Sequence, residues 1–471
     1  MKSFDRKEFL KITGLASIAG MGVFAGCSTR DEDATSPFTL NHNQEFNMSG
    51  YAAPKLETVR IGIIGIGNRG SGAVRRLSRI EGAEIVALCD VRPEQVDAAM
   101  TFLEETNHTP DSYTDSEDDW KRVCEREDID LIYICTPWHL HTPQAVFAMN
   151  HDKHAVTELP AANTIDECWQ LVKTSERTRK HCMMLGNVCY DFFEMMTLNM
   201  ARQGFFGEII HGEGAYIHDL MGLNFSKDTY HDLWRLKENI GRNGNIYAPH
   251  SIGPIAKTMN LNCGDKMDFL VSMSSNDFMM GARAQELAED DSFWESYTNK
   301  DYRGNINTTM IKTRKGRTIM LQHDVTSPRP YSRIHLISGT KGIARKWPLP
   351  ARIARSHEGW LPEDELREIE DEYTPEITKR VGEMARQVGG HGGMDTLMDW
   401  RLIDCLLNGL PLDMDVYDAA LWSAIGPLSE WSVENQYTSI PVPDFTSGSW
   451  KTNAPGMDIN LINGGTTKII G

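Results

Sequence analysis

The clearest pattern along the chain is an alternation of short apolar runs with helical stretches between residues 57 and 190. The run Val59–Ile64 is rich in β-branched residues, which is typical of a parallel strand buried on both faces, and residues 71–80 have helical character. Ala83–Cys89 predicts the next strand, and three more are predicted over residues 131–135, 154–157 and 182–186. This order predicts an α/β protein in which residues 57–190 form a doubly wound Rossmann domain.

The pattern changes after Gly207. Four strands are predicted here, over residues 208–216, 308–312, 318–325 and 334–338. The middle two would form a hairpin around Arg314-Lys315-Gly316. We therefore expect residues 191–471 to form an α+β domain, for substrate and oligomerisation, with an open, mostly antiparallel sheet.

Two further stretches of this domain carry expectations. Residues 222–300 are rich in Asn, Asp, Gly and aromatic residues and are too long for a connector, so we expect this insertion to build the active site. Residues 399–407 and 417–425 predict helices. We expect these C-terminal helices to pack back on the Rossmann domain.

Residues 1–27 have the pattern of an export signal. Arg6-Lys7 precedes an apolar run that is short for a membrane span and ends in small residues before Cys27. The start resembles a twin-arginine signal with lysine as its second basic residue, and Ala25-Gly26-Cys27 resembles a lipoprotein cleavage box with Phe24 where leucine is usual. We predict export to the periplasm or cell envelope, with a lipid anchor on Cys27 if that box is used. An uncleaved N-terminal anchor is the alternative.

The rest of the N-terminal segment and the overall composition indicate a tether and exclude some classes of partner and site. Residues 28–56, rich in Ser, Thr, Asn and Asp, predict a flexible tether. A net charge of −18 argues against nucleic acid as a partner. The nine cysteines include no CxxC pair, so neither a disulfide scaffold nor a metal site is predicted.

A glycine fingerprint follows the first strand. Gly65, Gly67 and Gly70 stand in the order GxGxxG, which allows a tight turn and a close approach to a pyrophosphate at a helix N-terminus. Asp90 ends the second strand, twenty residues after Gly70, where a carboxylate accepts hydrogen bonds from an adenosine ribose. This context predicts NAD; Arg69 and Arg92 lie close by in sequence and keep NADP open.

Polar side chains also follow two later strands. Thr136-Pro137-Trp138-His139-Leu140-His141 comes after residue 135, and Thr157-Glu158-Leu159-Pro160 closes the next strand. The carboxyl edge of a doubly wound sheet is where ligands bind. We therefore consider both a ligand role and a purely structural role for the two histidines.

Several motifs together resemble the Gfo/Idh/MocA family of dinucleotide-dependent sugar oxidoreductases and, within it, glycoside hydrolase family 109, the NAD-dependent α-N-acetylgalactosaminidases. Besides the two stretches above and Gly67-Asn68-Arg69-Gly70, the motifs are Tyr216-Ile217-His218-Asp219, Trp234-Arg235-Leu236, Tyr247-Ala248-Pro249-His250 and Gly390-His391-Gly392-Gly393-Met394-Asp395. The resemblance covers nearly the whole chain from about residue 57.

The resemblance implies residue roles. The positions that match NAD-binding residues are Asn68, Arg69, Asp90, Trp138, His139, Leu140, His141, Glu158, Leu159 and Asn187. The positions that match sugar-binding residues are Tyr216, Arg235, Tyr247, Ala248, Pro249, His250 and Tyr331. Relatives often pair through the open sheet, which implies a homodimer.

Two departures bear on the chemistry. Gly186-Asn187-Val188-Cys189-Tyr190 stands where the family has Glu-Asn-Cys-Cys-Tyr, which leaves details of the nicotinamide pocket open. Sugar dehydrogenases of the wider superfamily carry Glu-Lys-Pro with a proton-shuttling lysine, whereas this chain has Leu159, which cannot titrate. Leu159 is either a sign of the hydrolase branch or a neutral replacement with the base elsewhere.

The implied reaction is a transient oxidation, which differs from the usual pair of carboxylates in glycosidases. Hydride leaves the sugar C3, the resulting ketone acidifies the C2 proton, its removal expels the C1 substituent, water adds and the hydride returns. The NAD is then recycled within each turnover and needs to stay tightly bound. His250 is the first candidate for proton transfer, because imidazole titrates near neutrality, and Tyr247 is a second acid/base or an enolate donor.

The sequence is also compatible with two other functions. A net NAD(P)-dependent sugar or inositol oxidoreductase would need added cofactor and would accumulate NADH. A lipid-tethered sugar-binding protein with a vestigial dinucleotide would bind its ligands and release nothing.

Overall fold

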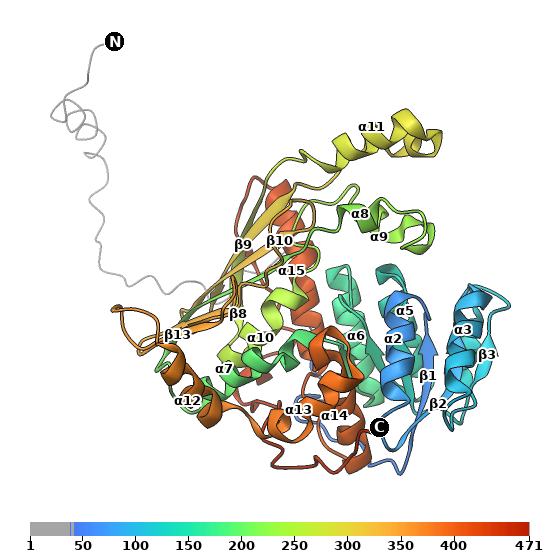
Figure 1. Ribbon diagram of the computed structural model, residues 1–471, viewed down its shortest axis with the longest axis horizontal. Coiled ribbons are helices and arrows are strands. Elements are labelled where there is room, and N and C mark those ends of the chain that lie inside the picture. The colour runs from blue at the N-terminus through green and yellow to red at the C-terminus, as the bar shows by residue number, and fades with distance from the viewer. Residues whose placement is uncertain (1–37, 39–41, 471) are drawn as a thin grey trace. The chain divides into compact units, whose positions relative to one another are not determined.

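The computed structural model describes residue 38 and residues 42–470 (Figure 1). The first domain is built around a parallel sheet. The strands are β1 (Val59–Ile64), β2 (Ala83–Cys89), β3 (Asp111–Tyr113), β4 (Leu131–Ile134), β5 (His154–Thr157) and β6 (Cys182–Met184). They lie in the order β3-β2-β1-β4-β5-β6, and every neighbouring pair is parallel. The order reverses between β1 and β4, where such sheets open a crevice at their carboxyl ends.

Helices connect these strands and cover the sheet. They are α2 (Asn68–Leu77), α3 (Pro93–Leu103), α4 (Asp119–Glu125), α5 (Trp138–Asn150) and α6 (Ile165–Thr178). α6 begins with a capping box: the Thr164 hydroxyl accepts the N–H of Glu167, and the Glu167 carboxylate accepts the N–H of Thr164. β4 and β5 are buried along their whole length, as expected for strands with helices on both faces. The prediction of a doubly wound Rossmann domain is confirmed.

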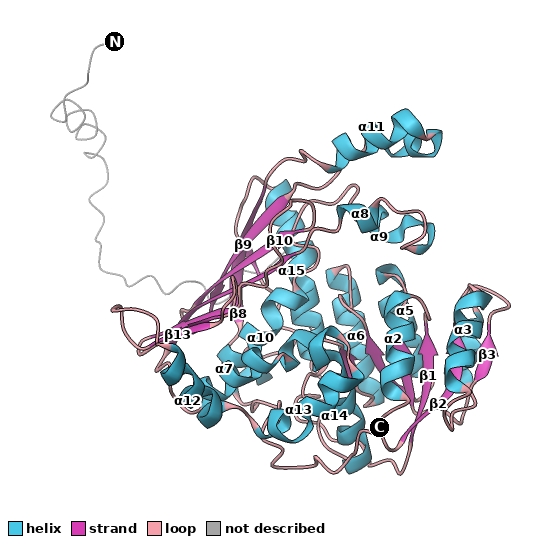
Figure 2. Ribbon diagram, in the orientation of Figure 1, coloured by secondary structure: helices cyan, strands magenta, loops and turns pink. Residues whose placement is uncertain are grey.

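A larger mixed sheet forms the second domain (Figure 2). The strands are β7 (Ile209–Ile217), β8 (Met267–Ser274), β9 (Ile306–Thr313), β10 (Thr318–Asp324), β11 (Leu336–Gly339), β12 (Ile343–Arg345), β13 (Arg352–Ala354) and β14 (Ile440–Pro441). β7 and β10 pair in parallel, and the other pairs of the order β13-β12-β11-β7-β10-β9-β8-β14 are antiparallel. Buried positions alternate along β9 and β10, so one face is covered. The predicted open, mostly antiparallel sheet is confirmed.

Helices that follow the Rossmann domain in the chain join the two domains. They are α7 (Phe192–Arg202), α10 (Pro249–Met259), α12 (Glu363–Tyr373), α13 (Glu376–Val388), α14 (Met394–Asn408) and α15 (Val416–Glu434). α10 packs closely on β7 at Gly214. No side chain would fit there, since a Cβ on Gly214 would lie 2.1 Å from the carbonyl oxygen of Ser251 on α10. α14 packs on α2 and β1, and α15 packs on α6 and β8, so the C-terminal helices lie against both sheets.

The predicted insertion over residues 222–300 is not a single unit. It contains β8 and α10, which belong to the sheet and to the main core. The rest, residues 220–240 and 275–302, forms a cap with its own small apolar core around Leu236, Met280 and Trp294. The cap includes α8 (Met221–Asn224), α9 (Trp234–Lys237) and α11 (Met280–Asp290). β8 shows no clear alternation in the sequence, because its exposed Met273 is apolar and its buried Ser272 is polar.

The predicted tether over residues 28–56 is wrong for its last part. Residues 42–56, the N-terminal arm, pack on α6 of the Rossmann domain and on the C-terminal helices α14 and α15, with Met48 and Ala53 buried. The N–H of Leu56 donates to the carbonyl oxygen of Leu406 at 3.0 Å. A polar composition predicted disorder, but tertiary partners for these polar groups order the arm.

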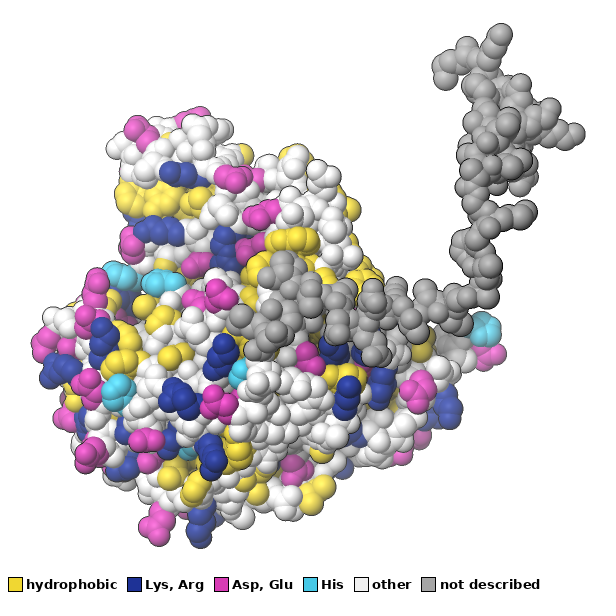
Figure 3. Space-filling view, turned by 180° about the vertical axis from the view of Figure 1, so that it is seen from behind, with side chains coloured by type: hydrophobic (Ala, Val, Ile, Leu, Met, Phe, Trp, Pro, Cys, Tyr) yellow, Lys and Arg dark blue, Asp and Glu magenta, His cyan; other side chains and the backbone are white. Residues whose placement is uncertain are grey.

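The predicted signal peptide, residues 1–27 with Cys27, lies outside the described residues. Among residue 38 and residues 42–470, no helix is both long and apolar enough to cross a membrane. Over the face of the molecule seen in Figure 3, acidic and basic side chains are interspersed rather than gathered by sign.

Candidate active site

A cleft of about 580 Å³ lies between the carboxyl edge of the parallel sheet and the cap. The loops after β2, β4 and β5 contribute Asp90, Trp138 and Glu158 to its wall. The cap contributes Tyr230 and Arg235 from the opposite side. Its size is within the range of about 300–1,000 Å³ usual for ligand sites.

The glycine turn at one end of the cleft fits a dinucleotide. Gly65 has φ +87°, and a Cβ on Gly70 would lie 1.8 Å from the carbonyl oxygen of Gly65. Gly67 caps α2, and within residues 42–470 no side-chain hydrogen bond caps the start of that helix. Free N–H groups at a helix N-terminus attract phosphate. Gly65 and Gly67 line the cleft, while Gly70 lies behind them and allows the close approach.

Asp90 is held at the end of β2 by backbone donors. Its Oδ2 accepts the N–H of Ile66 at 2.7 Å, and its Oδ1 accepts the N–H of Arg92 at 2.9 Å. Each carboxylate oxygen can accept a further bond, so a ribose hydroxyl has an acceptor here. The Arg92 guanidinium lies 3.3 Å from Asp90, so it is already paired. This pairing favours NAD over NADP.

Arg69 joins three parts of the chain. Its Nε donates to Glu158 at 2.7 Å, and its Nη1 donates to Asp395 on α14 at 3.2 Å. Asn187 donates from Nδ2 to the other oxygen of Asp395. The buried Oδ1 of Asn187 has no donor among the described residues, so it leaves an acceptor for a bound group. Asn68 also reaches across the cleft and donates to the carbonyl oxygen of Thr229 in the cap at 3.2 Å.

The motif after β4 forms the first turn of α5. Trp138, His139 and Leu140 line the cleft, and His141 stands behind them at its wall. The ring nitrogens of His141 lie 2.6 Å and 2.7 Å from the carbonyl oxygens of Pro160 and Thr136. His141 therefore joins the loops after β4 and β5, and its ring nitrogens are both engaged by the protein.

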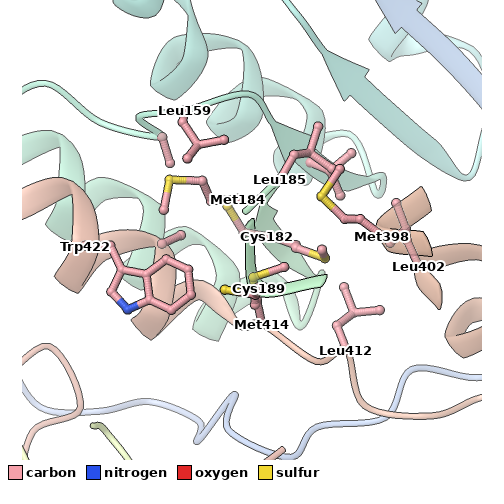
Figure 4. Packing of buried hydrophobic residues seen from close by; sticks show 14 of the residues in the cluster. Leu159, Cys182, Met184, Leu185, Cys189, Met398, Leu402, Leu412, Met414 and Trp422 are labelled. Carbon is pink, nitrogen blue, oxygen red and sulfur yellow. The ribbon is translucent and has the colours of Figure 1, made fainter. Parts of the chain in front are cut away.

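Leu159 provides no acid/base group. It is buried in the main core together with Met184 and Trp422 (Figure 4). Among the described residues that line the cleft there is no lysine. Val188, which stands where the family has a cysteine, is also buried in that core beside Cys189, and the Tyr190 hydroxyl donates to Asp413 at 3.0 Å.

The predicted sugar-binding residues form an aromatic cluster at the inner end of the cleft. Tyr247, just before α10, stacks on Trp138 with ring centroids 5.2 Å apart. Tyr216 from β7 stacks on His250 at 5.2 Å, and the rings of Tyr247 and His250 are 4.9 Å apart. The Arg235 guanidinium lies 5.0 Å from the centre of the Tyr247 ring. The structure thus brings five predicted residues together from both domains.

Burial sets the protonation of this cluster. It lowers the pKa of His250 well below its usual value, and the positive charges of Arg333 and Arg69 lower it further. Burial raises the pKa of Tyr247 and of Tyr216. At neutral pH His250 is therefore a neutral imidazole that can accept a proton, while Tyr247 keeps its phenolic proton and can donate a hydrogen bond.

The remaining predicted residues lie at the edges of this cluster. Tyr331 is 37% exposed, with its ring 5.1 Å from that of His218. His218 lies in turn beside Tyr216, since its Nδ1 is 3.3 Å from the Tyr216 hydroxyl. Ala248 and Pro249 are buried and do not line the cleft; they form the turn that positions Tyr247 and His250.

The C-terminal part of the chain adds functional residues to the site that were not predicted from the sequence. Asp395 holds Arg69 and Asn187, and its Oδ2 lies 2.8 Å from Nδ1 of His391. The motif from Gly390 to Asp395 supported the resemblance but was assigned no role. A histidine between glycines with a carboxylate four residues later was the available signal.

The fold and the cleft define the class of protein. The profile of the "Oxidoreductase family, NAD-binding Rossmann fold" matches residues 59–185. The fold is similar to that of levoglucosan dehydrogenase in complex with NADH and L-sorbose, with TM-score 0.63 and 16% identity over 83% of this chain and 100% of that chain. It is also similar to scyllo-inositol dehydrogenase from Lactobacillus casei with bound NAD(H) and scyllo-inositol, with TM-score 0.58 and 16% identity over 82% of this chain and 99% of that chain. The protein is thus a two-domain NAD-binding protein with the Gfo/Idh/MocA fold.

The second domain identifies the family. The profile of the "Glycosyl hydrolase 109, C-terminal domain" matches residues 190–452. An α-N-acetylgalactosaminidase of Bacteroides fragilis is 48% identical over 407 residues, which cover 85% of this chain and 95% of that protein. A glycosyl hydrolase family 109 protein of Shewanella woodyi is 42% identical over 469 residues, 97% of this chain and 99% of that protein. The chain belongs to glycosyl hydrolase family 109.

Proposed function

We propose that this enzyme hydrolyses terminal α-N-acetylgalactosamine residues of glycoconjugates, using an NAD that stays bound through every turnover. The named activity of the Bacteroides fragilis relative supports the substrate class. The observation that carries the reaction type is the ring contact at 4.9 Å between a neutral imidazole, His250, and a protonated phenol, Tyr247, beside the cleft. Elimination next to a ketone needs one group that takes a proton and another that donates to the enolate oxygen.

The residues that would hold the dinucleotide surround the cleft. The N-terminus of α2 fits the pyrophosphate, Asp90 fits a ribose hydroxyl, and Asn187 offers an acceptor on the nicotinamide side. When bound, NAD would supply a hydride acceptor for the sugar C3 and a hydride donor at the end of the cycle. The hydrogen bond from Asn68 to the cap supports tight retention, since the cap then closes one side of the cleft.

We assign roles on the sugar side from protonation and contact. His250 takes the proton next to the ketone, and Tyr247 donates to the oxygen that becomes negative. Tyr216 holds the His250 ring by stacking, and Arg235 stabilises negative charge near Tyr247. Tyr331, partly exposed, contacts the glycan at the rim.

Two further proposals concern where and how the enzyme works. The signal-like pattern of residues 1–27 supports export to the periplasm or cell envelope, with an anchor on Cys27. The uncovered face of the open sheet supports a homodimer. The charge of −18 favours a glycan over a nucleic acid as the partner.

The test is hydrolysis of 4-nitrophenyl α-N-acetylgalactosaminide in heavy water by purified protein without added NAD. We expect release of nitrophenol and one deuterium at C2 of the sugar product, because the C2 proton is exchanged with solvent during the cycle. A His250→Ala variant that retains both the dinucleotide and near-normal turnover would remove His250 from the mechanism.

The same experiment separates the alternatives. Nitrophenol without deuterium at C2 would indicate direct hydrolysis. No release, but NADH formation from free sugars after NAD⁺ is added, would indicate a net oxidoreductase. Binding of sugar and dinucleotide without either reaction would indicate a sugar-binding protein.

A further inference from the structure

A buried arginine behind the rim of the site has no part in the roles assigned above. Arg333 lies in the loop before β11 and is 5% exposed. Its Nη1 donates to the hydroxyl of Tyr331, the rim residue, at 3.3 Å. Its Nη2 donates to Glu194 Oε1 at 2.8 Å and to Asp191, both at the start of α7. One guanidinium therefore joins the phenol at the rim to α7.

The carboxylates that bind Arg333 are shared with a second cation. Lys346, directly after β12, has its Nζ 3.2 Å from Glu194 Oε2 and also donates to Asp191. The four side chains are between 1% and 14% exposed, and two cations face two carboxylates, so the cluster is paired in charge. An ammonium in place of the Arg333 guanidinium would keep this pairing. The guanidinium is needed to reach the carboxylates and the phenol at once, since its donors form a rigid planar fork.

The backbone and the ring of Tyr331 are held by other contacts. The next residue, Ser332, exchanges two N–H···O bonds of 3.0 Å with the last residue of β7. The Tyr331 ring contacts those of His218 and Trp347, with centroids 5.1 Å and 5.2 Å away. What Arg333 sets is the direction of the hydroxyl. Because the phenol oxygen accepts from the guanidinium, its own proton points elsewhere and is left for an acceptor on a ligand.

The charge of Arg333 also acts on the proposed base. Together with burial, this charge lowers the pKa of His250 well below its usual value, and it contributes more than any other charged group. The groups that face His250 from the other elements are Arg69, Arg235, His391, Tyr216 and Tyr247. Arg333 therefore helps keep His250 in the neutral form that can take a proton.

We propose that Arg333 is a positioning residue: its hydrogen bond directs the Tyr331 hydroxyl at an oxygen of the bound sugar, an inference that rests on the proposed function. A purely structural arginine would need only its ion pairs with Asp191 and Glu194. The bond to the phenol is not required for that role, because Ser332 already fixes the backbone and two rings already confine the side chain. That bond matters where the hydroxyl has a ligand to meet.

The experiment is a double-variant cycle on 4-nitrophenyl α-N-acetylgalactosaminide. Arg333→Lys keeps the charge and an ion pair but lacks the fork, and Tyr331→Phe keeps the ring but lacks the hydroxyl. We expect each to raise KM about 3- to 10-fold, the loss of one hydrogen bond, with kcat and dinucleotide content nearly unchanged. The double variant should match Tyr331→Phe alone, because the second substitution removes a bond already lost. Arg329→Lys, the same change at an exposed position of the same loop, is the matched control and should leave KM unchanged.

The pH profile is a second readout, which a structural role would not move. Arg333→Gln removes the charge, so the pKa of His250 should rise and the acid limb of kcat/KM should move to higher pH. Arg333→Lys keeps the charge and should leave that limb in place. The lysine variant also keeps the cycle decisive if Arg333→Gln does not fold.

These measurements separate failure of this inference from failure of the proposed function. KM effects that multiply in the double variant, an unchanged KM in Arg333→Lys, or an acid limb that moves in Arg333→Lys would overturn the role of Arg333, while hydrolysis by the unaltered enzyme leaves the proposed function standing. An acid limb that stays in place in Arg333→Gln would overturn the effect of its charge on His250. No release of nitrophenol by the unaltered enzyme would overturn the proposed function and this inference with it.

Discussion

Glu176 on α6 is a buried carboxylate whose donors come from both ends of the chain. His42 Nε2 lies 2.8 Å from its Oε2, and the N–H of Glu45 donates to the same oxygen at 3.0 Å. The Tyr417 hydroxyl on α15 donates to Oε1 at 2.8 Å. The side chains of His42 and Glu176 are 6% and 0% exposed, so water cannot replace a lost partner. We therefore predict that His42→Ala destabilises the folded protein.

The magnitude follows from these contacts. A hydrogen bond to a charged group contributes about 1.5–3 kcal/mol, and leaving a buried polar group without its partner costs about 1–3 kcal/mol. Since Glu176 keeps two other donors, we expect His42→Ala to lower the free energy of unfolding by about 2–3 kcal/mol. Glu176→Gln keeps the shape but removes the charge, and we expect a loss of about 2 kcal/mol.

The assay is urea unfolding followed by tryptophan fluorescence, with the exposed His357→Ala as a control expected to change stability by less than about 0.5 kcal/mol. In the double variant of His42 and Glu176, the losses should fall short of the sum by about 1–2 kcal/mol, because the second substitution removes a contact already lost. Losses that add to within about 0.5 kcal/mol would refute a pairing of His42 with Glu176 in the folded state.

Three other predictions concern the site and the response to pH. Gly70→Ala forces a Cβ to within 1.8 Å of the Gly65 carbonyl oxygen, so the purified variant should lose its dinucleotide, measured as NAD released on denaturation. Gly72→Ala is the matched control and should keep the dinucleotide, because its Cβ would meet the Arg76 guanidinium at 3.0 Å and no backbone atom of the glycine turn. Tyr247→Phe keeps the stack on Trp138 but loses its donor, so kcat should fall about 10²–10³-fold with dinucleotide content unchanged, and unchanged turnover would contradict its role. Burial lowers the pKa of His181 from 6.5 to about 4, so between these pH values the unfolded chain binds a proton that the folded chain does not. Stability should thus fall by up to about 3 kcal/mol as the pH falls from 6.5 to 4, and a His181→Gln variant with an equally steep decline in urea midpoint would be evidence against this cause.

Local sequence could predict the features that depend only on neighbouring residues, namely strand propensity and the conformation of glycine. β1 and β2 follow from runs of β-branched residues, and the glycine turn follows from spacing that a side chain at Gly70 would not allow. Asp90 could be assigned because its place at the end of β2 depends only on the strand before it. The same kind of signal failed for β8, because apolar residues such as Met273 occupy its exposed face and Ser272 is buried.

Part of the site came from resemblance rather than from pattern. Tyr247 and His250 were assigned as a pair through their motif, and the structure shows why three residues of separation suffice: the turn at Pro249 brings their rings to 4.9 Å. Their protonation was not predictable, because it depends on burial and on distant charges such as that of Arg333 in the loop before β11.

The sequence by itself determined the Rossmann domain, the dinucleotide fingerprint and the presence of an open-sheet domain, since strand periodicity and glycine conformation act over a few neighbouring residues. Two features were decided only by the tertiary structure. The polar residues 42–56 are ordered because His42 contacts the buried Glu176, and Asp395 contacts both Arg69 and His391 beside the cleft. These contacts join residues more than a hundred positions apart or depend on burial by distant segments. Removing these polar groups from water costs free energy unless they are paired with each other, and no local pattern records which groups will pair.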